Sequence, residues 1–149
     1  AVPRFVRRAR KIEGPRRISL LGSLTTAKPQ PKDADVLVLL APELDLAALA
    51  AAARQLQGHA QSANLGADIF LASEDHRYIG RICPWRECLP RAACRARHCG
   101  LRPHLNDDLD VITLEPDLIR HPPLDLWPEI TRRSELPKDV EALLLAGLR

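Results

Sequence analysis

The sequence predicts an α/β (α+β) domain with a small mixed β-sheet flanked by helices. Two apolar and partly β-branched runs, residues 34–40 and 67–72, have the length and composition of buried strands. Between them, residues 44–57 carry leucine and alanine at the spacing of one helix face. Strand, helix and strand in this order are the basis of the fold-class prediction.

The N-terminal part predicts one strand between two irregular segments. Residues 1–17 predict an irregular basic arm or a short helix. Residues 18–21 predict a short strand that stops at Gly22. Pro29 and Pro31 forbid regular structure in the loop that follows.

The rest of the chain predicts a helix, a further strand and a closing helix. Pro42 opens the helix over 44–57, and Gly58 is its expected stop. Residues 110–114 predict a fourth strand, and prolines break up the segment after it. Residues 137–148 predict the closing helix.

The composition predicts one ordered domain over residues 1–149, with a modest core. Hydrophobic residues make up 46% of the chain, which argues against disorder. Aromatic residues make up only 3%, and this scarcity weakens any prediction of an RNA-stacking surface.

Positive charge is concentrated in two segments. Residues 1–17 carry seven basic side chains against one acidic one, and residues 77–102 carry seven arginines against one glutamate. Each segment is therefore +6, and because the whole chain is +3 the remainder is −9. These segments suit phosphate-rich partners such as a nucleoside triphosphate or nucleic acid. Alternatively, they are solvated charge that keeps the protein soluble.

The sequence predicts a cytoplasmic protein. The N-terminus is charged and no apolar signal-peptide region follows it. No apolar stretch approaches the length of a membrane helix, so no membrane partner is expected.

Two aspartates, Asp33 and Asp35, stand at the entrance of the apolar run 36–40. In a strand they point to the same face, about 7 Å apart along the backbone. Two carboxylates at this spacing can share a hard cation, and without one they repel each other. Asp68 lies in the next predicted strand and joins them if the two strands are neighbours.

A tight turn at Gly22-Ser23 precedes this pair. Its backbone N–H groups and the Ser23 hydroxyl can wrap phosphate oxygens, and a glycine lets a phosphate approach closely. A second Asp-x-Asp, at 108–110, lacks such a turn upstream, and we interpret it as a strand or helix cap.

An apolar strand, Gly-Ser, nine residues, and Asp-x-Asp entering a second apolar strand resemble the nucleotidyltransferase superfamily of the DNA polymerase β type. The resemblance covers residues 16–72, and the short chain is similar to the minimal nucleotidyltransferases. It implies that Mg²⁺ is bound by the carboxylates of Asp33, Asp35 and Asp68. It also implies that a triphosphate is held at the turn, against Gly22 and Ser23.

The same resemblance implies the reaction. It predicts Mg²⁺-dependent transfer of a nucleoside monophosphate from ATP or another nucleoside triphosphate to a hydroxyl of an unknown acceptor, a small molecule, nucleic acid or protein. Minimal members often carry a basic residue after Gly-Ser, where this chain has Leu24. Lys28 and Lys32 are near enough in sequence to substitute for it. The alternative is a non-catalytic or antitoxin-like module that binds RNA or a protein partner.

All four cysteines fall in a Cys/Arg-rich insertion, residues 75–106. They are Cys83, Cys88, Cys94 and Cys99. Four thiolates make a closed structural zinc site, and His76, His98 or His104 could replace one of them. Disulfides and plain buried thiols are the alternatives.

Overall fold

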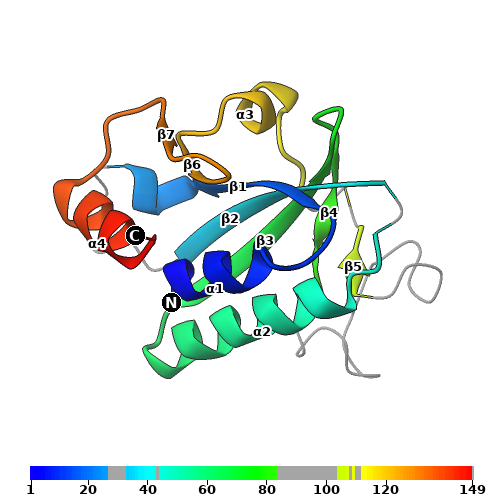
Figure 1. Cartoon of the computed structure of the whole chain (residues 1–149), viewed down its shortest axis with the longest axis horizontal. Helices are drawn as coiled ribbons and strands as arrows, with labels where there is room; N and C mark the ends of the chain where they lie inside the picture. The colour runs from blue at the N-terminus through cyan, green and yellow to red at the C-terminus, as the bar shows by residue number, and fades with distance from the viewer. Residues whose placement is uncertain (27–32, 43, 84–103, 108, 110–111, 149) are drawn as a thin grey trace.

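The described residues of the computed structural model form one seven-stranded mixed sheet with helices on both faces (Figure 1). The structure describes residues 1–26, 33–42, 44–83, 104–107, 109 and 112–148. The strand order is β5-β4-β3-β2-β1-β6-β7. A mixed sheet with helices around it confirms the predicted α+β class.

The centre of the sheet consists of β1, β2 and β3. Strand β1 (Pro15–Leu21) runs antiparallel to β2 (Asp33–Leu40). Strand β3 (Gly66–Ser73) runs parallel to β2, and helix α2 (Ala47–Ser62) connects the two. This strand–helix–strand unit confirms the arrangement predicted from residues 34–72.

Both edges of the sheet are antiparallel additions to this centre. Strands β4 (Tyr78–Ile82) and β5 (Leu105–Asn106) extend it beyond β3. Strands β6 (Leu124–Trp127) and β7 (Thr131–Arg132) extend it beyond β1. In the described part of the chain, β2 and β3 are thus the one parallel pair.

The helices form two unequal layers. Helices α1 (Val2–Ala9) and α2 cover one face of the sheet (Figure 1). The short helix α3 (Pro116–Arg120) lies on the other face. Helix α4 (Lys138–Leu148) packs beside α1, next to the N-terminus.

Side-chain alternation divides the core between these two faces. On β2, Val36 and Val38 belong to the main core under α1 and α2. Leu37 and Leu39 belong to a smaller core on the face that α3 covers. Because alternate residues of a strand share a face, this assignment also fixes the side on which the strand's polar residues lie.

The helix predicted over 44–57 begins and ends later in the chain than predicted, and the predicted stop at Gly58 is wrong. Helix α2 runs from Ala47 to Ser62. A glycine inside a helix costs only about 1 kcal/mol. Leu56 and Ala60 are both buried, and their packing outweighs that cost.

The strand predicted over 110–114 is also wrong where it can be checked. Residues 112–114 are described and form no strand, whereas 110 and 111 lie outside the described residues. Ile112 and Leu114 instead pack against the smaller core from the segment before α3. Their apolar alternation therefore reflects burial without strand pairing.

Both terminal predictions agree with the structure. Residues 2–9 form the short helix that was one option for the N-terminal segment, and it buries Val2, Phe5, Val6 and Ala9. The closing helix, predicted over 137–148, is α4. Each helix in the described ranges is too short or too polar to span a membrane.

Candidate functional site

The parallel pairing of β2 and β3 brings the three predicted carboxylates to one place. Asp35 lies directly opposite Asp68, and Asp33 lies opposite Gly66. Asp33 and Asp35 share the strand face of Leu37, which is the face away from α1 and α2. The three aspartates therefore form a carboxylate row along the edge where β2 and β3 begin.

The Gly22 turn lies directly against this row. Leu21, the last residue of β1, pairs with Asp35, and Gly22 starts a short 3₁₀ helix, η1 (Gly22–Thr25). A Cβ atom added to Gly22 would collide with the Asp35 carboxylate, and the φ of Gly22 is +73°. Glycine is thus required here both for its backbone conformation and for the approach of Asp35.

The turn is held by its own hydrogen bond. The Thr25 hydroxyl donates to the Gly22 carbonyl oxygen at 2.6 Å. This bond uses the carbonyl of Gly22 and fixes the backbone beside Asp35. The turn and the carboxylate row consequently lie side by side at the end of β1 and the start of β2.

The carboxylate row concentrates negative charge at one end of the β2–β3 pair. Burial, and then the neighbouring charges of Asp68 and Asp33, raise the pKa of Asp35 from 3.8 to about 6. An opposite charge lies on β4, where Arg81 Nη1 is 3.7 Å from Asp68 Oδ1. Arg81 thus forms an ion pair with Asp68, and the row holds two further carboxylates, those of Asp33 and Asp35.

The carboxylate oxygens of the row are of the ligand type that magnesium binds. Mg²⁺ prefers oxygen ligands and is commonly held by one or two carboxylates together with substrate phosphates. As the side chains stand, no three His, Cys, Asp or Glu residues of the described chain form a metal-holding group. Asp35 leans over Gly22 and Asp33 over Gly66, so enclosing one ion requires side-chain rotation.

Several predicted site residues lie outside the described residues. These are Lys28, Lys32, Cys88, Cys94 and Cys99, and the side chain of Ser23 is not described either. Cys83 is buried at the end of β4, and its backbone N–H donates to the His104 carbonyl at 2.9 Å. The zinc site stays a prediction.

Sequence reasoning missed two residues beside the carboxylate row, Arg81 and Gly66. Arg81 belongs to β4, whose run Tyr78-Ile79-Gly80-Arg81-Ile82 has the aromatic and β-branched residues that favour a strand. That signal lies within the segment predicted as a Cys/Arg-rich insertion. Gly66 precedes the strand predicted over 67–72, but in the structure it starts β3 opposite Asp33.

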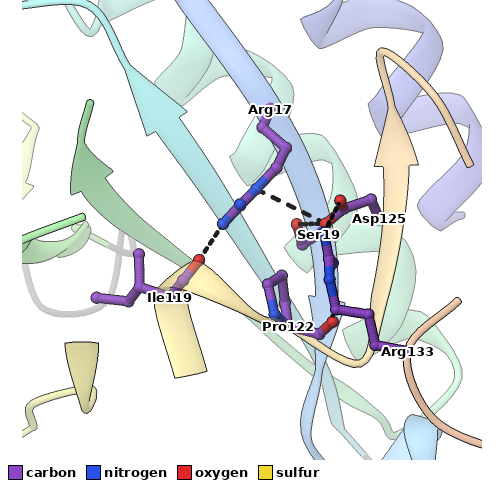
Figure 2. Close-up of polar contacts among 6 residues, drawn as sticks. All are labelled: Arg17, Ser19, Ile119, Pro122, Asp125 and Arg133. Carbon is purple, nitrogen blue, oxygen red and sulfur yellow. Dashed lines mark hydrogen bonds and ion pairs between the residues drawn. The ribbon is translucent and has the colours of Figure 1, made fainter. Parts of the chain in front are cut away.

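A second polar cluster lies further along β1 on the same strand face (Figure 2). Asp125 of β6 is buried; it accepts a hydrogen bond from the Ser19 hydroxyl at 2.7 Å and another from Arg133 at 2.8 Å. Arg17 Nε lies 3.7 Å from the same carboxylate. Burial lowers the pKa of Arg17, although Asp125 opposes this effect.

This second cluster is structural. Arg17 also donates to the Ile119 carbonyl, and Arg133 donates to the Pro122 carbonyl at 3.0 Å (Figure 2). Its charges are thus engaged in joining β1 to β6 and to the segment around α3. The carboxylate row, with its excess charge, is the better candidate for a ligand site.

Comparisons of the chain with known protein families, curated proteins and solved structures gave no match.

Proposed function

We propose that this chain has a nucleotidyltransferase fold and transfers a nucleoside monophosphate from a nucleoside triphosphate to a hydroxyl acceptor, with Mg²⁺ as cofactor. One observation carries the proposal: Asp35 and Asp68 pair in register on parallel strands, with Asp33 on the same face and Gly22 against Asp35. The arrangement follows the order of elements on which the family resemblance was based.

The charge of the row supports a cationic ligand. Two carboxylates opposite each other on neighbouring strands are destabilising unless something neutralises them. The raised pKa of Asp35 reflects its burial first and then this repulsion. When bound, Mg²⁺ supplies charge neutralisation of the triphosphate and lowers the pKa of an acceptor hydroxyl.

The chain's own residues have separate roles in the proposed reaction. Asp33 and Asp35 would hold Mg²⁺, and the Gly22 turn would present backbone N–H groups to the triphosphate. The acceptor oxygen attacks the α-phosphorus, the α–β phosphoanhydride bond breaks, and pyrophosphate leaves with its electron pair. Asp68 accepts the hydroxyl proton or completes the ligand set. Positioning and charge stabilisation supply most of the acceleration.

The test is Mg²⁺-dependent binding of labelled ATP, CTP, GTP and UTP by equilibrium dialysis. Wild-type protein is expected to bind at least one of them, and Asp33→Asn/Asp35→Asn to lose that binding. Asp139→Asn is the matched control, because it removes an exposed carboxylate from the first turn of α4, away from the row. Equal binding by the double variant and the wild type would reject the proposal.

A second candidate is a non-catalytic module that binds RNA or an acidic protein surface. Helix α1 favours it: Arg4, Arg7 and Arg8 are exposed, opposite the buried side of the helix. Binding of this kind depends on salt concentration and on α1, and it does not depend on the carboxylates. Binding of RNA that survives Asp33→Asn/Asp35→Asn but fails in Arg4→Ser/Arg8→Ser would favour this candidate.

A further inference from the structure

An apolar pocket of about 530 Å³ opens at the edge of the sheet where β2 and β3 begin. It lies between the start of α1, the last turns of α2 and helix α4. Its walls are mainly aliphatic, with these residues among them: Leu24, Ala34, Leu56, Leu65, Leu143 and Leu144. Pockets of this size and composition typically hold small molecules.

Two side chains of the pocket are left largely in solvent. Leu143 is 73% exposed and Leu65 is 44% exposed. They are two of the four large hydrophobic side chains that the described chain leaves exposed, and both line this pocket. An apolar ligand in the pocket would remove their surface from water, which is favourable.

The lip of the pocket leads toward the carboxylate row. Asp33 and Gly66, the first residues of β2 and β3, both line the pocket. Asp33 is also one end of the row, and its carboxylate lies over Gly66. A polar end of a molecule in the pocket can therefore reach the row at Asp33.

The charge at this lip restricts which molecules fit. Asp33 is the acidic residue of the described lining, which holds no lysine or arginine; its other ionisable groups, the Ala1 α-amino group and His59, belong to the walls formed by α1 and α2. An acceptor phosphate or carboxylate would meet a like charge here. A hydroxyl can donate a hydrogen bond to the carboxylate instead.

We propose that this pocket is the acceptor site and that the acceptor is a small apolar alcohol. The alcohol's carbon body lies between α2 and α4, and its hydroxyl lies at Asp33. This inference rests on the proposed function for the role of the hydroxyl, and on the pocket itself for the apolar body. The transfer step is the one given above, with this hydroxyl as the attacking oxygen.

The pocket is tested with the neutral fluorescent probe N-phenyl-1-naphthylamine. The probe is expected to bind and to be displaced by 1-decanol, and displacement by decanoate is expected to be about tenfold weaker because of Asp33. In Asp33→Asn the difference between decanol and decanoate is expected to disappear. A purely structural role of Asp33 would not change this ratio.

Two matched pairs of variants locate the binding site. Leu143→Gln is expected to weaken probe binding about tenfold, whereas Ile130→Gln, at another exposed apolar residue, leaves it unchanged. Ala63→Trp, at the pocket wall, is expected to block the probe. Ala51→Trp, at an exposed position of α2 away from the pocket, is its control.

The outcomes separate this inference from the proposed function. Nucleotide binding without probe or alcohol binding would overturn the inference alone. Alcohol binding without binding of any nucleotide would overturn the acceptor role together with the proposed function. Dimers that Leu143→Gln dissociates, in the absence of alcohol binding, would assign the pocket to a second copy of the chain and overturn the inference.

Discussion

At the scale of single residues, Asp35 shows how the proposed binding site is costly to the folded state. It is half-buried, faces Asp68 across the strand pair, and lies against the Gly22 turn. Nothing in the packing of the sheet needs a carboxylate at this position. A residue that is unfavourable for folding but suited to a cation is what a functional site is expected to contain.

This conflict predicts a pH-dependent effect of Asp35→Asn on stability. The pKa of Asp35 is about 6 in the folded state and 3.8 without the fold, so between these values the folded protein holds a proton that the unfolded chain has released. Stability therefore falls as pH rises from about 4 to about 6. After discounting for solvent screening, Asp35→Asn is expected to be more stable than wild type by about 1 kcal/mol at pH 7.5.

Urea unfolding in metal-free buffer measures this effect. The gain is expected to vanish near pH 4, where wild-type Asp35 is protonated in the folded state. Asp139→Asn, an exposed carboxylate in the first turn of α4, is the matched control measured at the same pH values. A destabilised Asp35→Asn at pH 7.5 would show that burial and repulsion do not dominate at this residue.

Two glycines give a contrasting prediction. Gly22→Ala places a Cβ against Asp35 and forces alanine to a φ of +73°, and it is expected to cost about 2 kcal/mol. Gly58→Ala meets no atom within 4 Å inside helix α2, and it is expected to gain about 0.5–1 kcal/mol. Denaturant unfolding measures both free energies of unfolding. If Gly22→Ala left the stability unchanged, the close approach of the turn to the carboxylate row would be contradicted.

At the scale of elements, the buried cluster around Asp125 attaches β6 to the centre of the sheet. Asp125→Asn keeps the shape of the side chain but leaves Arg17 and Arg133 without their counter-charge. Removing one member of a buried ion pair is expected to cost about 3 kcal/mol. Thermal and urea unfolding measure the loss.

The exposed ion pair between Arg16 and Glu74 supplies the comparison. Its side chains are 59% and 45% exposed, and Glu74→Gln is expected to change the stability by less than about 1 kcal/mol. Similar losses in Asp125→Asn and Glu74→Gln would mean that the buried cluster contributes little to attaching β6.

The same element shows where sequence reasoning ends. The carboxylate row could be predicted because it depends on local rules: alternation along a strand, and a helix that returns the chain to a parallel neighbour. Strand β6 is only four residues long, Leu124 to Trp127, and a proline stands on each side of it. Its place beside β1 depends on contacts between distant residues, such as the hydrogen bond between Ser19 and Asp125, which are 106 residues apart. A single sequence carries no local signal for such a pairing.

The errors in α2 and in residues 112–114 have the same origin. Gly58 is a stop signal by its own propensity, but packing of the residues on both sides overrides it. Ile112 and Leu114 alternate like a strand, and yet they pair with no strand among the described residues. In each case tertiary contacts determine the structure, and the local residue pattern does not reveal those contacts.

At the scale of the whole molecule, the described elements differ greatly in how firmly they are held. Strands β2 and β3 lie in the middle of the sheet and are covered on both faces. Helix α4 buries only Leu144, and it rests on α1 through contacts such as Gly147 with Pro3. The wall formed by α4 is therefore the part of the apolar pocket that is held by the least buried surface.

This difference predicts a hierarchy in native-state hydrogen exchange. Amides of β2 and β3 are expected to exchange only through global unfolding, and their protection should follow the denaturant dependence of the whole molecule. Amides of α4 are expected to exchange through local opening, about a hundredfold or more faster, because so little apolar surface is lost when α4 detaches. Bound 1-decanol should slow α4 selectively if the pocket holds it, since a ligand stabilises the conformation that it binds. Protection in α4 equal to that in β2, with or without the alcohol, would show that the helix is an integral part of the core and that the pocket wall is rigid.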